Sequence, residues 1–134
     1  HRGSSAASDV YKRQAYISCQ NPLNRCLGMT TLYMVKSNPV AGKEDAYNRW
    51  YSDVHLPEVL RIDGFQTAQR FKLHPRQVQP NHTHTYLAIY QINSNDVDGT
   101  LANLSKATWM NLSDAIDMTS LEIDIYQAMG DVQS

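Results

Sequence analysis

The chain has 134 residues, of which 42% are apolar and 19% charged, and its formal net charge is −1. This length predicts a single domain. The near-neutral charge gives no footprint for nucleic acid, and no polybasic run suggests a membrane surface. No apolar run approaches the ~20 residues of a membrane helix, and no secretory signal pattern is visible. We therefore expect a cytoplasmic globular protein that binds neither nucleic acid nor membrane.

Residues 1–28 differ in character from the rest of the chain. The stretch HRGSSAASDVYKRQ, residues 1–14, has no periodicity and resembles a translated sequencing-adapter string. Residues 15–28 contain Asn-Pro and glycine breakers and both cysteines, Cys19 and Cys26. We expect a disordered or artefactual extension over residues 1–28 and a folded domain over residues 29–134. Because that domain lacks cysteine, it can hold neither a disulfide scaffold nor a thiolate metal site.

The domain begins with a predicted strand and a predicted helix. TTLYMVK, residues 30–36, is β-branched and aromatic, and it runs into the turn sequence SNPVAG. A helix is expected from about Lys43. Its apolar stripe falls at i, i+3, i+4 and i+7, on Tyr47, Trp50, Tyr51 and Val54. Pro57 has no amide hydrogen, so the regular helix should end or kink just before it.

The remaining elements follow after a turn at Asp63-Gly64. Residues 65–74 and 83–92 predict two strands, joined by a proline-bracketed loop. A shorter helical stripe follows on Leu101, Leu104, Ala107 and Trp109. Residues 111–120 predict an extended connection, and residues 121–128 alternate as a last strand. The order β-α-β-β-α-β predicts an α+β, ferredoxin-like fold, with an antiparallel four-stranded sheet and both helices on one face.

A sheet covered by helices on one side has a second face to explain. In the strand over residues 83–92, Leu87 and Ile89 lie on one face, and Tyr86, Ala88 and Tyr90 lie on the other. In the last strand, Tyr126 shares a face with acidic residues. Because solvated faces are usually polar, a tyrosine-rich face indicates partial burial against a partner subunit or around a ligand. Tyr86, Tyr90 and Tyr126 are therefore interface or ligand-binding candidates.

Several residue types recur at fixed offsets in YNRWYSDVHLPEVLRIDGFQTAQRF, residues 47–71. They are Trp50, Tyr51, His55, Pro57, Gly64, Phe65 and Arg70. This signature resembles the EthD-like family of the dimeric α+β barrel superfamily, and the resemblance extends from Met29 to Met129. The family usually has proline before the glycine, where this chain has Asp63.

The resemblance implies a homodimer that closes into a barrel through the open sheet faces. It also implies a small hydrophobic or aromatic ligand between sheet and helices. Relatives include ring-cleaving or isomerising enzymes, cofactor-free monooxygenases and a polyketide cyclase, so we expect no cofactor. EthD itself has no settled chemistry, and a fold does not fix a function.

Two hypotheses stay open for His55. In the first, it is a general base or acid, because an ordinary imidazole pKa of about 6.5 suits proton transfer at neutral pH. Tyr51, four residues earlier, would share its helix face and complete a catalytic pair. In the second, His55 caps the end of the helix before Pro57 by satisfying free carbonyl groups.

Other candidates carry weaker signals. Trp50 is a ligand-binding candidate, although an apolar stripe more often faces the core. Arg70 could bind a carboxylate ligand or pair with an acidic residue of a partner subunit, and the ion pair is favoured. His82 and His84 lie on one strand face near His74, but no acidic or cysteine ligand is close in sequence, so no metal is predicted.

Two functions lead on this basis, and the resemblance leaves a weaker third, a haem- or metal-handling barrel, which would need an open histidine facing a large apolar pocket. The first is a cofactor-independent enzyme, a lyase, isomerase or monooxygenase, in which His55 transfers protons and Tyr51 and Arg70 orient the substrate. The second is a non-catalytic homodimeric accessory or binding protein. A cavity at His55 would favour the first, and a His55 already hydrogen-bonded to backbone would favour the second.

Overall fold

The computed structural model of the chain describes residues 30–134, and the predicted extension over residues 1–28 lies outside the described residues. Within residues 30–134 the elements are β1 (Thr31–Pro39), α2 (Glu44–Trp50), the π-helical turn η1 (Tyr51–His55), α3 (Leu56–Val59), β2 (Phe65–Lys72), β3 (Tyr86–Ile92), α4 (Val97–Ser105) and β4 (Ile116–Gln127). The boundary of the domain at residue 29 stays a prediction.

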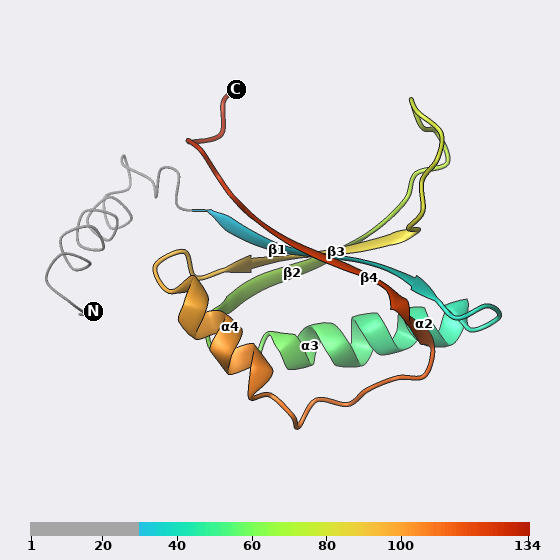
Figure 1. Cartoon of the computed structure of the whole chain (residues 1–134), viewed down its shortest axis with the longest axis horizontal. Coiled ribbons are helices and arrows are strands. Elements are labelled where there is room, and N and C mark those ends of the chain that lie inside the picture. The colour runs from blue at the N-terminus through green and yellow to red at the C-terminus, as the bar shows by residue number, and fades with distance from the viewer. Residues whose placement is uncertain (1–29) are drawn as a thin grey trace, which may run out of the picture.

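The four strands form one sheet in the order β2-β3-β1-β4, and every neighbouring pair is antiparallel. The helices of residues 30–134 all lie on one side of this sheet (Figure 1). The predicted α+β, ferredoxin-like architecture is therefore confirmed. Strand β4 is longer than predicted, because residues 116–120 of the expected connection already pair with β1 near its end.

The predicted effect of Pro57 is partly wrong. The segments α2, η1 and α3 follow one another without a break, so the helix continues past Pro57 to Val59. The regular α geometry does stop before the proline, at Trp50, and resumes at Leu56. A proline ring clashes with the carbonyl four residues earlier, and a wider turn relieves that clash. The π turn before the proline thus takes the place of the expected end or kink of the helix.

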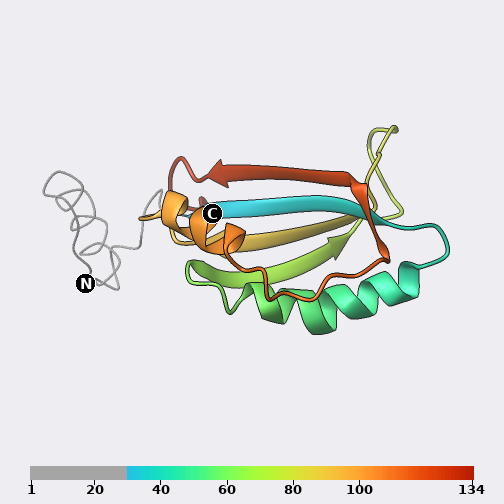
Figure 2. The same cartoon turned by 60° about the horizontal axis from the view of Figure 1, so that its bottom comes forward.

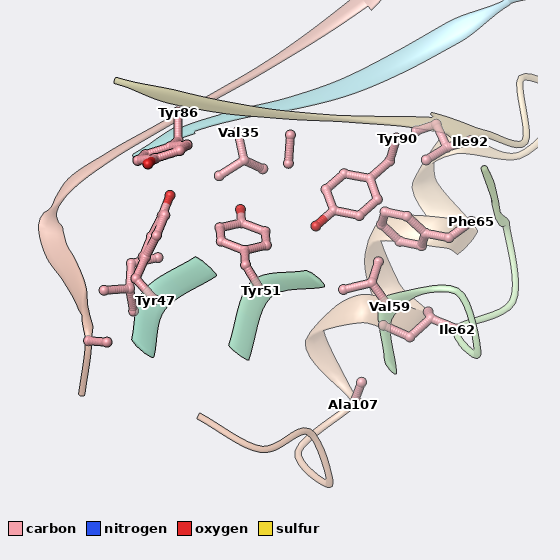
Figure 3. Close-up of a cluster of buried hydrophobic side chains, with 13 residues drawn as sticks. Val35, Tyr47, Tyr51, Val59, Ile62, Phe65, Tyr86, Tyr90, Ile92 and Ala107 are labelled. Atoms are coloured by element: carbon pink, nitrogen blue, oxygen red, sulfur yellow. The ribbon is translucent and has the colours of Figure 1, made fainter. Parts of the chain in front are cut away.

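The tyrosine-rich face of β3 is turned toward the helices. Tyr86, Ala88 and Tyr90 are buried, and cross-strand pairing puts Tyr33 beside Tyr90 on the same face. Figure 3 shows Tyr86 and Tyr90 between the sheet and the helix that carries Tyr51. The expectation that this face is the open one, where two copies meet, is wrong for β3. Strand alternation defines two faces but does not say which of them points inward.

Helix α4 covers only one end of the sheet. Its N-cap residue Asp96 accepts a hydrogen bond from the Gly99 amide at 2.9 Å, and Asn103 donates to the Asp63 carbonyl at 3.0 Å. The helix stops at Ser105, so it includes Leu101 and Leu104 of the predicted stripe but not Ala107 and Trp109. From there the chain runs back to β4 along the long helix, as we call the continuous run of α2, η1 and α3 (Figure 2). No helix among residues 30–134 has the length and apolar character needed to cross a bilayer.

Candidate active site

A cluster of aromatic rings links the middle of the long helix to the sheet. We call it the tyrosine–histidine cluster, and it consists of Tyr33, Trp50, Tyr51, His55 and Tyr90. Trp50 stacks on His55 with ring centroids 4.6 Å apart, and Tyr51 meets His55 at nearly a right angle at 5.2 Å. On the sheet, Tyr33 and Tyr90 make an edge contact at 6.0 Å. Figure 3 shows the Tyr90 hydroxyl directed back toward Tyr51.

The π turn sets the positions of Tyr51 and His55, which are its first and last residues. The Leu56 amide donates to the Tyr51 carbonyl, five residues back, instead of to the carbonyl four back. Such single turns within α-helices often occur at functional sites, because they shift side chains out of ordinary helical register. The helix therefore departs from α geometry at the two residues that were predicted to act together.

Two buried polar atoms in this cluster have no hydrogen-bond partner within residues 30–134. They are the His55 Nδ1 and the Tyr90 hydroxyl oxygen. Buried polar groups in proteins are nearly always paired, so an unpaired one requires an explanation such as a bound ligand or a catalytic role. The helix-capping hypothesis for His55 is wrong, because the helix runs on past it and His55 makes no cap hydrogen bond.

Burial controls the protonation of the cluster. Loss of solvent lowers the pKa of His55 below its ordinary value, and the nearby Glu58 carboxylate opposes this shift. Burial also raises the pKa of Tyr51 to about 12 and the pKa of Tyr90 well above its ordinary value. At neutral pH the imidazole is therefore uncharged, with one nitrogen able to accept a proton, and both phenols keep theirs.

One side of the cluster opens toward β4. On the helix side of the sheet, Ile125 of β4 pairs with Tyr33, which pairs with Tyr90. Ile125 is 42% exposed, Tyr33 is half-buried and Tyr90 is only 1% exposed. Ile123, the next helix-side residue of β4, is 47% exposed. Solvent exposure thus decreases along an apolar row that runs from Ile125 of β4 to the Tyr90 ring, because no helix of the described residues covers β4.

The loop between α4 and β4 is fixed to the helix beside His55. The Trp50 indole N–H donates to the Asn111 carbonyl at 2.9 Å. The Glu58 carboxylate accepts from the Asn111 amide at 2.9 Å and from its side-chain nitrogen at 2.6 Å. Because His55 stacks on Trp50, these bonds hold the orientation of the imidazole indirectly.

Comparison with known families shows which family the chain belongs to. The profile of the family described as Domain of unknown function (DUF4286) matches residues 30–100, more than half of the chain. The chain belongs to the DUF4286 family. The match includes β1, the long helix, β2 and β3, and so all the residues of the tyrosine–histidine cluster. The family description assigns no activity, and a search of curated proteins found no significant match.

A search of solved structures returned the crystal structure of an ethyl tert-butyl ether d (EthD) family protein from Bacillus halodurans. It is 15% identical to this DUF4286 chain, with a TM-score of 0.48, and the alignment covers 75% of this chain and 99% of that one. That protein's family is the one that the sequence resembles. The match is distant and says nothing about the chemistry of this chain.

Arg70 contacts the helix that carries Tyr51 and His55 directly. Its guanidinium donates to Asn48 at 2.7 Å and to Ser52 at 2.9 Å, and its carbon lies 4.6 Å from the centre of the Tyr51 ring. No carboxylate of residues 30–134 lies within ion-pair distance of it. An ion pair across a dimer stays a prediction. In this DUF4286 chain Arg70 therefore contacts Tyr51 of the tyrosine–histidine cluster.

The other predicted residues are dispersed. Tyr86 is buried in the same face but donates its hydroxyl hydrogen to Glu44, so its polar atom is already occupied. Tyr126 lies on the opposite face of the sheet and is 59% exposed. The structure thus brings together Trp50, Tyr51, His55 and Tyr90, and it separates Tyr126 from them.

Sequence analysis missed three residues that shape the site. Tyr33 lies in the first strand, and its cross-strand partner could not be known without the register. Glu58 lies three residues after His55 on the same helix, which is a detectable spacing. Asn111 has no local signal, because its contacts to Trp50 and Glu58 span more than fifty residues.

Proposed function

We propose that the tyrosine–histidine cluster binds a small hydrophobic or aromatic molecule and that His55 transfers a proton to or from it without a cofactor. One observation carries this proposal: two buried atoms of this cluster, the His55 Nδ1 and the Tyr90 hydroxyl oxygen, have no hydrogen-bond partner in the part of the chain that the structure describes. An apolar body would lie against the rings, and its polar group would pair with these two atoms.

The chemistry follows from the protonation states. A neutral imidazole accepts a proton from an acidic O–H or activated C–H of the ligand and becomes a cation. The resulting anion on the ligand is stabilised by a hydrogen bond donated from the protonated Tyr90 hydroxyl. Return of the proton from His55 to another atom of the ligand would complete an isomerisation or a bond cleavage. Trp50, held by Asn111, keeps the ring oriented during both steps.

NMR titration of the His55 ring tests this proposal. The full chain would be titrated with a panel of small phenols and aliphatic acids. We expect at least one phenol to change the His55 pKa and to shift resonances of Tyr51 and Tyr90. His55→Gln should abolish these shifts, whereas the control His82→Gln, at an exposed histidine, should leave them intact. A His55 ring that no compound affects, in a protein that folds normally, would contradict the proposal.

The alternative is a non-catalytic homodimeric accessory protein, and one feature favours a dimer in either case. The sheet face away from the helices carries the half-buried side chains of Leu32, Met34, Leu87 and Ile89. No helix of the described chain covers this face (Figure 1). An apolar sheet face of this kind is typical of an interface. A cytoplasmic location remains a prediction from the sequence.

Sedimentation equilibrium tests the dimer. We expect the chain to sediment as a dimer and the Ile89→Glu variant as a monomer, because a charge would be buried at the centre of the interface. Ala102→Glu, on the exposed side of α4, is the control. A wild-type chain that is monomeric at high micromolar concentration would contradict this part of the proposal.

A further inference from the structure

A line of buried hydroxyl groups crosses the interior between the sheet and the long helix. We call it the hydroxyl network, and its members are Tyr47, Ser37, Tyr51 and Tyr90, each at most 2% exposed. The Tyr47 and Ser37 hydroxyls share a hydrogen bond of 2.6 Å. Figure 3 shows the hydroxyl ends of Tyr47 and Tyr51 turned toward the sheet, and that of Tyr90 turned toward Tyr51. Polar groups thus extend through an interior that is otherwise largely apolar.

Tyr51 joins the two halves of the hydroxyl network. Burial raises the pKa of Tyr51 to about 12, and hydrogen bonding from Tyr90 and Ser37 opposes this rise. The rings of Tyr47 and Tyr51 also meet edge to face, with centroids 5.3 Å apart. The Tyr51 hydroxyl therefore lies between that of Ser37 and that of Tyr90.

Arg70 lies at the Tyr47 end of the hydroxyl network. Its guanidinium carbon is 5.4 Å from the centre of the Tyr47 ring and 4.6 Å from that of Tyr51. Burial raises the pKa of Tyr47 above its ordinary value, whereas the Ser37 hydroxyl, the Arg70 charge and a hydrogen bond from Arg70 oppose this rise. Because no carboxylate of residues 30–134 is within ion-pair distance of Arg70, its positive charge is not neutralised there.

Arg70 sets the direction in which the hydroxyl network donates. A guanidinium has only donor hydrogens, so the Tyr47 hydroxyl oxygen must accept from it. The hydroxyl hydrogen of Tyr47 is then free for Ser37, and that of Ser37 is free for Tyr51. In the same order Tyr51 donates toward Tyr90, whose own hydrogen has no acceptor within the described residues. Each donor polarises the next, so a cation at one end strengthens the donor at the other.

We infer that Arg70 is a positioning residue that makes the Tyr90 hydroxyl a strong hydrogen-bond donor, and that the site takes a weak oxygen acid, such as a phenol or an enol, as its anion. The inference rests on the proposed function, in which Tyr90 donates to the anion that forms when His55 takes the proton. Arg70 acts through the other hydroxyl groups and does not touch the ligand. Because an oxygen anion accepts a hydrogen bond more strongly than a neutral oxygen, the network favours such acids over neutral ligands of the same shape.

The spectrum of bound para-nitrophenol tests this inference on the full chain, because its phenolate absorbs visible light and the neutral phenol does not. At a pH below that at which the free probe ionises, we expect the bound probe to show the phenolate band. The methyl ether para-nitroanisole has the same ring but no acidic hydrogen. Its affinity therefore reports changes in the shape of the site alone.

Ser37→Ala interrupts the hydroxyl network between its two ends. It should weaken phenolate binding by roughly tenfold, raise the apparent pKa of the bound probe by about one unit, and leave the affinity for the ether unchanged. Thr31→Val is the control, because Thr31 is also on β1 and is 2% exposed. Its hydroxyl donates to that of Ser94 at 2.8 Å, outside the network.

Substitutions of Arg70 separate its charge from its packing. Arg70→Gln should have the same effect on both probes as Ser37→Ala. Arg70→Lys should keep most of the phenolate binding, because an ammonium group is also a cation with only donor hydrogens. A purely structural role of Arg70 would instead weaken the phenol and the ether alike.

A double-mutant cycle in urea denaturation tests the hydroxyl network without a ligand. Ser37 pairs with Tyr86, which precedes Tyr90 by four residues on β3, a separation of roughly 13 Å along the sheet. Substitutions this far apart normally have additive effects on the free energy of unfolding. We expect Ser37→Ala and Tyr90→Phe to be non-additive, because the network couples them through Tyr51.

Additive effects in this cycle, or equal losses of phenol and ether binding in Ser37→Ala, would overturn the inference. Both results would leave the proposed function intact, because the His55 ring would still respond to a ligand. A bound probe that stays neutral would also overturn the inference. A His55 ring that responds to no phenol would contradict the proposed function and, with it, the ligand class assigned here, even if the two variants were non-additive.

Discussion

The Tyr90 hydroxyl provides a direct test of whether the site holds unpaired groups in solution. Tyr90 is 1% exposed, and its hydroxyl interacts with that of Tyr51 but makes no hydrogen bond of normal geometry within residues 30–134, so Tyr90→Phe removes a buried polar atom and breaks no well-formed hydrogen bond. An unsatisfied buried polar group costs about 1–3 kcal/mol. We therefore expect Tyr90→Phe to raise the free energy of unfolding by about 1 kcal/mol, a melting-temperature increase of roughly 4–8 °C for a domain of this size.

Tyr47→Phe is the matched control, because Tyr47 is another fully buried tyrosine of the same interior. Its hydroxyl shares a 2.6 Å hydrogen bond with that of Ser37, which is 1% exposed. Tyr47→Phe breaks this short buried hydrogen bond of Ser37, so the free energy of unfolding should fall by about 1–3 kcal/mol. The same chemical change thus has opposite expected signs at two sites.

Urea denaturation at pH 7 measures both variants, and equal m-values would confirm that the unfolded states are comparable. A Tyr90→Phe variant that is destabilised by about 1 kcal/mol or more would refute the reasoning. It would show that the hydroxyl is hydrogen-bonded in the free protein, and the main support for a ligand at the tyrosine–histidine cluster would be lost.

Two further predictions concern pH and backbone strain. Burial lowers the folded-state pKa of His55, so below about pH 6.5 the unfolded chain takes up a proton that the folded chain does not, and stability falls. The slope, at most about 1.4 kcal/mol per pH unit, should disappear from urea titrations of His55→Gln and persist in His82→Gln. Gly64 has φ of +103°, and a Cβ there would lie 2.0 Å from the Thr100 hydroxyl oxygen. Gly64→Ala should therefore lower stability by about 2–4 kcal/mol, against about 1 kcal/mol for Gly42→Ala, where nothing lies within 4 Å; similar losses at both glycines would contradict this packing.

Local patterns were sufficient to predict the fold. The helical stripe through Tyr47 and Tyr51 and the alternation in the last two strands are strong periodic signals, and their order specifies the ferredoxin-like topology. The direction in which β3 faces was not predictable, because both of its faces are bulky and hydrophobic. The continuation past Pro57 was also not predictable, since it depends on a π turn that no sequence pattern identifies.

The residues that the helix contributes to the site were predicted, whereas those contributed by β1 and by the loop before β4 were missed. The spacing of Tyr51 and His55 is local, so it could be recognised from one segment. The contacts of Tyr33 depend on strand register, and those of Asn111 depend on where a loop returns to the helix. Sequence reasoning also treated Tyr126 and Tyr90 alike, although they lie on opposite faces of the sheet.

The energetics of the interior favour a functional explanation for the tyrosine–histidine cluster. A phenylalanine in place of Tyr90 would fill nearly the same volume without an unpaired hydroxyl, so the fold alone does not require a tyrosine there. Each unpaired atom costs about 1–3 kcal/mol, which is a large part of the roughly 5–15 kcal/mol that stabilises a domain. Tyr86 and Tyr47, in the same interior, have partners for their hydroxyl groups. One of the two unpaired groups, the Tyr90 hydroxyl, belongs to the residue at which the apolar row from Ile125 through Tyr33 ends, so this row leads from the exposed edge of the sheet to the buried tyrosine.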